Sequence, residues 1–495
     1  MSSLCWVVVV VVAGAVMAAS NAEVRNATIA IDTSDVVQEP ASPTLSSLLS
    51  LSIAFRSVRE LLTVVSELKQ HPVPIRTAAF GVIRGTYHSA TEVLLPMVNP
   101  IGSGRSRSEW PWTLDAVTRF IIAFSRDPIN LRFVRHVTQA SLLALRTVLN
   151  SLRSSIETFR SSMHPYRPHA LIDFMLHSID THHVEVRRED FVAHWIFNRH
   201  SSLDLPPVDT FDVVVLYAHG GGFVLGDALQ WLDSMGALMT RASKHSLKLA
   251  FFSVEYSLSP ESPFPAAPDQ CEAAYRYLLE DLVISPRKII IAGDSSGGNL
   301  AASLATHVLA TGALPQPAGI VLISPFMNLN CDSPSFTRNA VFDWIGPAPA
   351  RQAAGMYMGI DSHLEADLEL GITGGLLSDP RVSPIFADLR GLAPLLIFAG
   401  GREIFVDDIV AFANKAKQSG VDVELHMDNR TMSPDGFMVH VYPFVGALLG
   451  EKHVGKALDC FIAFVADRCG VPLASNAQFA IQEALESTTV IDVPV

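Results

Sequence analysis

The sequence RKIIIAGDSSGGNLAASLATHVL, residues 287–309, is the stretch that decides the fold. It begins with three consecutive isoleucines that predict a buried strand, and residues 299–309 predict a helix. Between them lies a Gly-x-Ser-x-Gly turn in which Gly293 and Gly297 bracket Ser295. A turn this tight leaves almost no room for a Cβ beside the serine. The pattern therefore predicts a nucleophile elbow, which exposes the Ser295 hydroxyl above a sheet.

A second glycine-rich string, His219-Gly220-Gly221-Gly222, follows a predicted strand at residues 212–217. Consecutive glycines let the chain approach a substrate closely and present bare N–H groups. We expect Gly220, Gly221 and Ser296, the residue after the nucleophile, to donate N–H groups to an oxyanion. The string alone is typical of a flexible turn. Two strings in this order, each after a strand, indicate a site for acyl transfer.

At these residues the chain resembles the hormone-sensitive-lipase-like branch of the α/β-hydrolases, which includes bacterial esterases and arylacetamide deacetylase-like enzymes. The segments EYSLSPESPFPAA at 255–267 and DPRVSP at 379–384 are also similar to that family, so the resemblance covers roughly residues 180–470. It implies an α/β-hydrolase fold, with a mostly parallel central sheet flanked by helices and covered by a helical cap. It also implies a carboxylesterase or lipase-like hydrolase in which Tyr256 braces the glycine loop.

A serine nucleophile needs a general base and an acid that orients the base, and in this fold both follow the serine in the chain. Glu403 comes after a predicted strand at residues 394–399 and is the expected acid. The resembling family usually carries Asp at this position, and Glu is one methylene longer. Asp407 is the alternative acid, although it could instead serve to begin a helix at residues 408–419.

Five histidines follow Ser295, and their positions select His440 as the general base. It comes after the final predicted strand, residues 421–427, where this fold delivers its base. His426 lies within that strand, on a face that we expect to be solvated. The other three are His307 in the helix after the elbow, His363 in a polar stretch and His453 in an exposed Lys-rich segment.

The predicted mechanism is a two-step acyl transfer through an acyl-enzyme, for which no cofactor is required. We expect His219, Gly222 and Asp294 to support the loops of the site rather than to take part in the chemistry. The sequence has no His-x-x-x-His or paired-cysteine spacing, so we expect no metal site. The expected partner is a small apolar ester substrate. A net charge of −13 argues against nucleic acid as a partner.

The N-terminus predicts entry into the secretory pathway. Val7 to Val12 form an apolar run that is followed by small residues, so residues 1–22 are expected to be a cleaved signal peptide. The absence of Lys and Arg before the run keeps a signal-anchored membrane protein as the alternative. Asn26 and Asn429 are then possible glycan acceptors, with Asn26 favoured. The four remaining cysteines permit two disulfides, and buried free thiols are the alternative.

Four regions are expected in all. After the signal peptide, residues 23–165 predict an N-terminal helical region, either a cap or lid packed on the hydrolase or an element that contacts a membrane surface or lipid. Residues 166–472 are the expected catalytic domain, with a cap insertion around residues 326–392. Residues 473–495 are expected to be a surface tail.

A rival interpretation is a catalytically silent receptor that binds a small molecule on the same fold. Plant gibberellin receptors resemble this family but have lost the histidine. The presence of Ser295, His440 and Glu403 in this chain argues for the enzyme. The acyl chain length of the ester stays open, because apolar pockets discriminate only weakly per methylene.

Overall fold

The computed structural model describes residues 181–198, 205–340, 342–343, 345–360, 375–428, 440–445 and 451–473, with side chains in the last range from residue 455 onward. The predictions for the signal peptide, the N-terminal helical region, both glycan acceptors and the C-terminal tail lie outside these residues.

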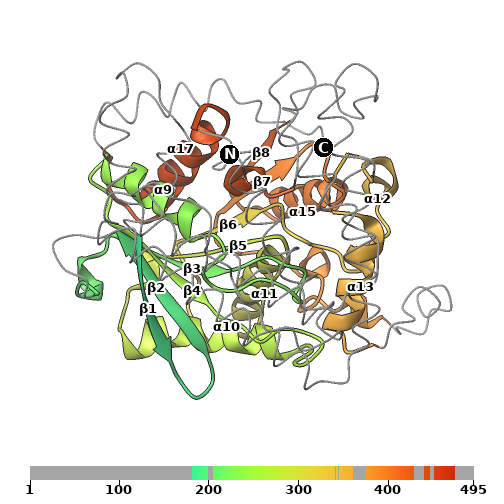
Figure 1. Ribbon diagram of the computed structural model, residues 1–495, viewed down its shortest axis with the longest axis horizontal. Coiled ribbons are helices and arrows are strands. Elements are labelled where there is room, and N and C mark those ends of the chain that lie inside the picture. The colour runs from blue at the N-terminus through green and yellow to red at the C-terminus, as the bar shows by residue number, and fades with distance from the viewer. Residues whose placement is uncertain are drawn as a thin grey trace, which may run out of the picture. The chain divides into compact units, whose positions relative to one another are not determined.

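The described part of the chain is organised around an eight-stranded sheet with the order β1-β2-β4-β3-β5-β6-β7-β8 (Figure 1). The pairs β1–β2 and β2–β4 are antiparallel, and every other pair is parallel. The strands are β1 Thr181–Arg187, β2 Val192–Asn198, β3 Val213–Ala218, β4 Leu249–Val254, β5 Ile289–Asp294, β6 Gly319–Ile323, β7 Leu395–Gly400 and β8 Val423–Asp428. The predicted α/β-hydrolase fold with a mostly parallel sheet is confirmed.

The amino-acid sequence of each strand explains its position in the sheet. β3 (VVVLYA), β5 (IIIAGD) and β7 (LLIFAG) are buried at every residue, as expected for parallel strands covered on both faces. β1 (THHVEVR) alternates between more and less exposed side chains, which suits an edge strand with one solvated face. The central strands therefore end deep in the molecule, where a site can be shielded from water.

Helices cover both faces of the sheet (Figure 1). The side chains of α9 and α17 pack in one core cluster, and those of α10, α11 and α15 pack in the other. The α-helices are α9 Leu232–Ser243, α10 Ala266–Arg276, α11 Ser295–Thr311, α12 Pro334–Arg338, α13 Pro347–Tyr357, α15 Val406–Gln418, α16 Tyr442–Val445 and α17 Glu451–Arg468. Single turns are η2 Val208–Thr210, η3 Tyr277–Asp281, η4 Pro286–Lys288, η5 Leu376–Ser378 and η6 Pro384–Phe386.

The predicted cap insertion, residues 326–392, carries α12 and α13. The ring of Tyr357 at the end of α13 stacks on Phe223, with centroids 3.8 Å apart. A Cβ at Gly222 would come within 3.0 Å of Ala353 in the same helix. The insertion therefore packs directly against the glycine loop, and Gly222 is small because α13 occupies the space beside it.

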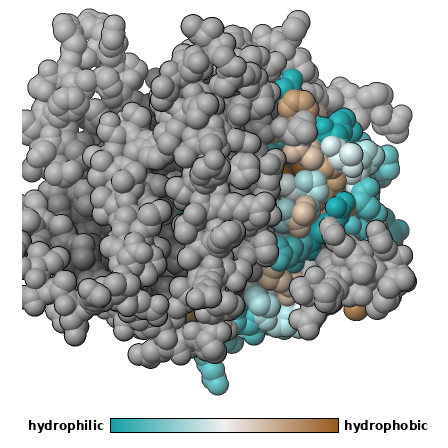
Figure 2. All heavy atoms as spheres, turned by 45° about the vertical axis from the view of Figure 1, so that its right-hand side comes forward, coloured by the Kyte–Doolittle hydropathy of each residue, from teal (hydrophilic) through white to brown (hydrophobic). Residues whose placement is uncertain are grey.

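The surface of the described residues is mixed in polarity. On the face drawn in Figure 2, hydrophilic and hydrophobic residues lie intermixed over the described region. Among the described residues, the large apolar side chains that are exposed are Val283, Leu376 and Phe386.

The described cysteines, Cys271, Cys331, Cys460 and Cys469, are free thiols rather than disulfides. Among the helices that the structure describes, none combines the length and apolarity needed to cross a membrane.

Candidate active site

The turn between β5 and α11 holds Ser295 in a strained conformation. Its φ is 53°, a left-handed value that is uncommon for a residue with a side chain. A Cβ at Gly297 would collide with the backbone oxygens of Ala218 and His219. Glycine is therefore required here so that the elbow can press against the end of β3. The predicted helix also starts earlier than residue 299, since α11 begins at Ser295 itself.

The glycine loop is fastened to the elbow by Asp294. The Gly220 N–H donates to Oδ1 of Asp294 over 2.8 Å, and the Tyr217 hydroxyl donates to the same oxygen over 2.6 Å. The prediction that Gly220 serves as an oxyanion donor is therefore wrong, because its N–H is already used to hold the loop. Gly221 and Gly222, with φ of 124° and 63°, carry the chain over the site. The N–H of Ser296 lies in the first turn of α11, where no carbonyl one turn earlier competes for it.

Asp294 is buried at 2% exposure. Burial raises its pKa to about 6, and the hydrogen bonds from Tyr217 and Gly220 oppose that rise by stabilising the carboxylate. This aspartate thus joins three segments of the site, namely the end of β3, the glycine loop and the elbow.

His219 and Tyr256 support the glycine loop from the other side. Their rings stack with centroids 4.1 Å apart, and the Tyr256 hydroxyl donates to the His219 carbonyl over 2.7 Å. Burial lowers the pKa of His219 to about 4, so its imidazole is neutral at pH 7. The side chain of Tyr256 also interacts with that of Ser296 in the elbow, so these two residues support the loop and its junction with the elbow.

The structure brings His440 and Glu403 together. Nδ1 of His440 lies 2.9 Å from Oε2 of Glu403, and Oε1 of Glu403 accepts the Gly400 N–H over 3.1 Å. The exposures of the two side chains are 1% and 0%. Oε1 of Glu403 is thus held by the N–H at the end of β7, and Oε2 is directed at the imidazole of His440.

Burial dominates the titration of this pair. It raises the pKa of Glu403 to about 8, although hydrogen bonds from Ser324 and the Gly400 N–H favour the charged carboxylate. Burial also lowers the pKa of His440, and the carboxylates of Asp343 and Asp294 oppose that change. A neutral imidazole, able to accept a proton, is therefore the favoured form of His440 at neutral pH.

Asp407, the alternative acid, points elsewhere. Its carboxylate pairs with Arg338 at 2.6 Å, and its side chain is 30% exposed. It lies in the first turn of α15, where a negative charge favours the helix dipole. Of the two candidate acids, the structure therefore brings only Glu403 to His440.

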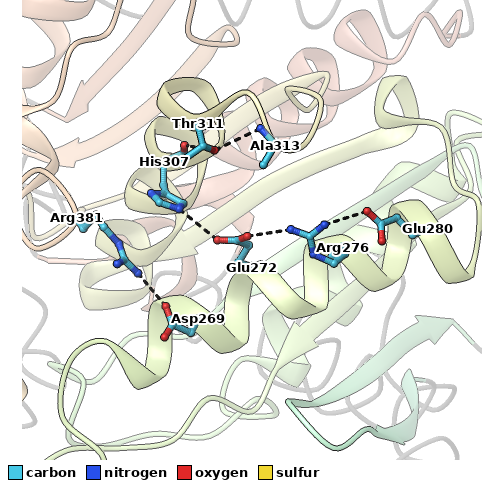
Figure 3. Close-up of polar contacts among 8 residues, drawn as sticks. All are labelled: Asp269, Glu272, Arg276, Glu280, His307, Thr311, Ala313 and Arg381. Atoms are coloured by element: carbon cyan, nitrogen blue, oxygen red, sulfur yellow. Dashed lines mark hydrogen bonds and ion pairs between the residues drawn. The ribbon is translucent and has the colours of Figure 1, made fainter.

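The remaining histidines lie away from the elbow or outside the described residues. His307 extends from α11 toward Glu272 of α10, 3.4 Å away, in a row of ion pairs with Arg276 (Figure 3). The expectation that His426 is solvated is wrong, since it is 3% exposed and lies against the ring of Phe398. His363 and the side chain of His453 lie outside the described residues.

Ser295 and the His440–Glu403 pair share one edge of the sheet. β5, β6, β7 and β8 are consecutive parallel neighbours, and each candidate residue follows the carboxyl end of its strand. The loop after β6 connects them: the Phe326 N–H donates to the Ser295 carbonyl over 2.9 Å, and Phe326 stacks on Phe405. Phe405 in turn meets the His440 ring edge to face, with centroids 5.1 Å apart.

Two polar residues of this site were missed from the sequence. Ser324 accepts the Val441 N–H over 2.9 Å and so fixes the segment that follows His440. It stands directly after β6, as Ser295 does after β5, and this position was the available signal. Asp343 is 1% exposed and faces the pair from the cap insertion. Its segment gave no signal, because nothing in the spacing connects it to Glu403.

Metal ligands do not gather in this part of the molecule. Within the described ranges, no group of three or more His, Cys, Asp or Glu side chains could hold a metal ion.

Comparison with known proteins agrees with this fold. A family model described as the alpha/beta hydrolase fold matches residues 215–432. An esterase of Acinetobacter venetianus is 38% identical over 213 residues, which are 43% of this chain and 63% of the esterase. An acetyl-hydrolase of Streptomyces hygroscopicus is 36% identical over 258 residues, 52% of this chain and 76% of the relative.

A solved structure of an esterase from the bacterial hormone-sensitive lipase family is 27% identical, with a TM-score of 0.48 over 65% of this chain and 98% of the other. The class of protein is that of the α/β-hydrolases, and the relatives of this chain include enzymes named esterase and acetyl-hydrolase. The chain belongs to the α/β-hydrolase family. It spans less than two thirds of the Acinetobacter esterase, at 63%.

Proposed function

We propose that the protein hydrolyses carboxylic esters with Ser295 as nucleophile, His440 as general base and Glu403 as the orienting acid. The observation that carries the proposal is the buried 2.9 Å contact between Nδ1 of His440 and Glu403, at the sheet edge where the strained Ser295 stands. A surface carboxylate would not be expected to orient a histidine in this way. The names of the two relatives, esterase and acetyl-hydrolase, support the same reaction.

The first half of the reaction makes an acyl-enzyme. Oγ of Ser295 attacks the ester carbonyl carbon while Nε2 of His440 takes the hydroxyl proton. The carbonyl oxygen becomes an oxyanion that accepts hydrogen bonds from the N–H groups of Gly221 and Ser296. Collapse of the tetrahedral intermediate breaks the bond to the alcohol, which leaves with the proton from His440. Glu403 stabilises the imidazolium while it exists.

The second half releases the acid. A water molecule gives a proton to His440 and attacks the acyl carbon, and the proton returns to Ser295 as the acyl bond breaks. The enzyme is thereby restored without a cofactor. The substrate that suits this cycle is a small apolar ester, and the acyl group is short, acetyl or lipid-like.

The nucleophile is tested by labelling. A fluorophosphonate probe should add to wild type with the mass increment on the peptide that contains Ser295, and the Ser295→Ala variant should not react. Nitrophenyl acetate hydrolysis should fall by at least about 10³-fold in the same variant. Failure of the correctly folded wild type to hydrolyse any ester would favour the receptor interpretation instead.

The acyl group is tested by a series of nitrophenyl esters from acetate to palmitate. A steep decline in kcat/KM beyond butyrate would assign a short-chain esterase and exclude a lipase. Rates that hold through the long chains would assign a lipid-like substrate. Each additional methylene is worth at most about 1–3 kcal/mol in an apolar pocket, so the whole series is needed.

We further propose that the protein enters the secretory pathway, is glycosylated at Asn26 and makes lipid contact through residues 23–165. The valine run at Val7 to Val12 and the small residues after it support this location. N-terminal sequencing of the mature protein should begin near residue 20–23, and endoglycosidase should increase its mobility on a gel. A retained N-terminus would argue for the signal-anchored form, and failure to bind lipid vesicles would argue against the lipid contact.

A further inference from the structure

The backbone that carries Glu403 is held by a segment of the cap insertion, residues 335–343. The Asn339 side-chain amide donates to the Glu403 carbonyl over 2.9 Å, and the Ser335 hydroxyl donates to the Ile404 carbonyl over 2.5 Å. Oδ2 of Asp343 accepts the Ile404 N–H over 2.8 Å. Three side chains from one segment thus form hydrogen bonds with the carbonyls of Glu403 and Ile404 and with the N–H of Ile404.

These three side chains are buried. Ser335 is 0% exposed, Asn339 is 4% exposed and Asp343 is 1% exposed. The three residues lie 60 or more positions before Glu403 in the chain, so only the fold brings them to it. Because a buried polar group is destabilised when it loses its partner, the three bonds restrict the Glu403–Ile404 peptide strongly.

Asp343 differs from the other two because it can carry a charge. The charged or titratable groups that face the His440 ring from the packed elements are Asp343 of the cap insertion, Asp294 at the end of β5 and Glu403 after β7. The neighbouring cation, Arg402, lies over the ring of Phe342, with 4.8 Å to the ring centroid. The charged groups that face the imidazole are therefore carboxyl groups, while Phe405 packs against its ring.

We propose that Asp343 is a positioning residue that fixes the peptide of Glu403 and supplies a second negative charge beside His440. This role rests on the proposed function of the Ser295, His440 and Glu403 set. Fixing the peptide keeps the long glutamate side chain in one orientation, with Oε2 at the imidazole. The second charge favours the imidazolium that forms while His440 holds the proton of Ser295, and so stabilises the transition state.

The test compares Asp343→Asn with wild type. The amide oxygen of the variant can still accept the Ile404 N–H, so the peptide stays in place while the charge is lost. We expect kcat for nitrophenyl acetate to fall about tenfold with KM changed less than about twofold, because the interaction matters mainly in the transition state. The acidic limb of kcat/KM should move to lower pH by about one unit, because loss of a nearby negative charge lowers the pKa of His440.

Two further variants separate positioning from charge. Asp343→Ala removes the acceptor as well and should lower kcat more than Asp343→Asn does. Asn339→Ala should lower kcat while leaving the acidic limb where wild type has it, because no charge is changed. Asp388→Asn removes an exposed carboxylate that pairs with Arg390, and it serves as the matched control with wild-type kinetics.

A spectroscopic measurement makes the proposal independent of turnover. The low-field proton NMR signal of Nδ1–H in protonated His440, assigned by its loss in His440→Ala, should appear at a lower pH in Asp343→Asn than in wild type. An unchanged NMR midpoint and an unchanged acidic limb in Asp343→Asn would overturn the role of its charge. If the NMR midpoint differs between Asp343→Asn and wild type but wild type hydrolyses no ester, the proposed function would be overturned instead.

Discussion

Gly220 donates its backbone N–H to the Asp294 carboxylate over 2.8 Å, so the residue before the nucleophile holds the first glycine of the oxyanion loop. One side chain thereby couples the elbow to the glycine loop. The donors proposed for the oxyanion of the substrate are the N–H groups of Gly221 and Ser296, and we expect their positions to depend on this bond. The geometry of the loop therefore depends on Asp294 as well as on the glycines.

Removal of this bond should reduce catalysis without abolishing binding. In Asp294→Ala the glycine loop loses its anchor, and we expect kcat to fall about 10- to 100-fold, which is less than the roughly 10²–10³-fold for complete loss of one oxyanion donor. KM should change little, because the loss is felt mainly in the transition state. Steady-state kinetics with nitrophenyl acetate checks this. Tyr217→Phe, which removes only the second bond to Asp294, should show a smaller effect, and a change in KM alone would contradict the interpretation.

The choice between the two acids can be tested directly. Glu403→Ala should lower kcat about 10³- to 10⁴-fold, because the imidazole loses the group that orients and stabilises it. Asp407→Ala removes an exposed ion pair with Arg338 and should leave kcat within about twofold. Parallel kcat measurements on the two variants, with circular dichroism to verify folding, decide the matter. A large loss in Asp407→Ala would show that the 2.9 Å contact at Glu403 is not the functional one.

The elbow should not tolerate a methyl group at Gly297. In Gly297→Ala the new Cβ collides with the carbonyls of Ala218 and His219, so the turn must open or β3 must move. We expect the free energy of unfolding to fall by about 2 kcal/mol or more, with loss of activity. Gly455→Ala in α17 is the matched control: its Cβ would meet only Arg241, at 3.6 Å, and it should be neutral or slightly stabilising. Urea denaturation measures both.

Activity should increase as pH rises through about 8. The reaction needs a neutral His440 and a charged Glu403, and burial raises the pKa of Glu403 to about 8. Protonation of either group at lower pH removes the base or its orienting charge, so kcat/KM should fall on the acidic side. A kcat/KM profile from pH 5 to 10 measures the apparent pKa values, which belong to the pair. A flat profile between pH 6 and 9 would contradict this account.

Stability should have the opposite pH dependence. Burial raises the pKa of Glu255 to about 7, of Asp294, Asp343 and Asp408 to about 6, and of Glu403 to about 8. The folded state then holds protons that the unfolded state has released, so this contribution is complete below about pH 4 and is lost as pH rises through 6 to 8. Differential scanning calorimetry should give a lower Tm at pH 9 than at pH 5.5. Asp408→Asn should flatten the curve below pH 7, and a Tm that rises with pH would refute the assignment.

The sequence predicted the strand, turn and helix around Ser295 because their signals are local. A buried strand, a Gly-Asp-Ser-Ser-Gly turn and a helix can be recognised within 23 residues, since the tight turn depends on neighbours in the chain. Ser295, Glu403 and His440 each follow a predicted strand, in the chain order that this fold uses. The acid was left open between Glu403 and Asp407, because both stand within one turn of the same strand end.

The errors arose where the answer depends on contacts between distant segments. Alternation predicted a solvated His426, but Phe398 of the neighbouring strand covers it. Gly220 was expected to face a substrate, yet its N–H meets a side chain 74 residues later in the chain. Neither neighbour can be identified from the local pattern around the residue itself.

By itself the amino-acid sequence determined the fold and the family and nominated the residues that we propose for acyl transfer, because turn geometry and strand burial are fixed by adjacent residues. Only the tertiary structure decided which acid meets His440, which glycine N–H groups stay available and that Asp343 joins the site. Those choices depend on hydrogen bonds between segments brought together by the sheet and the cap insertion, and such bonds leave no trace in local spacing.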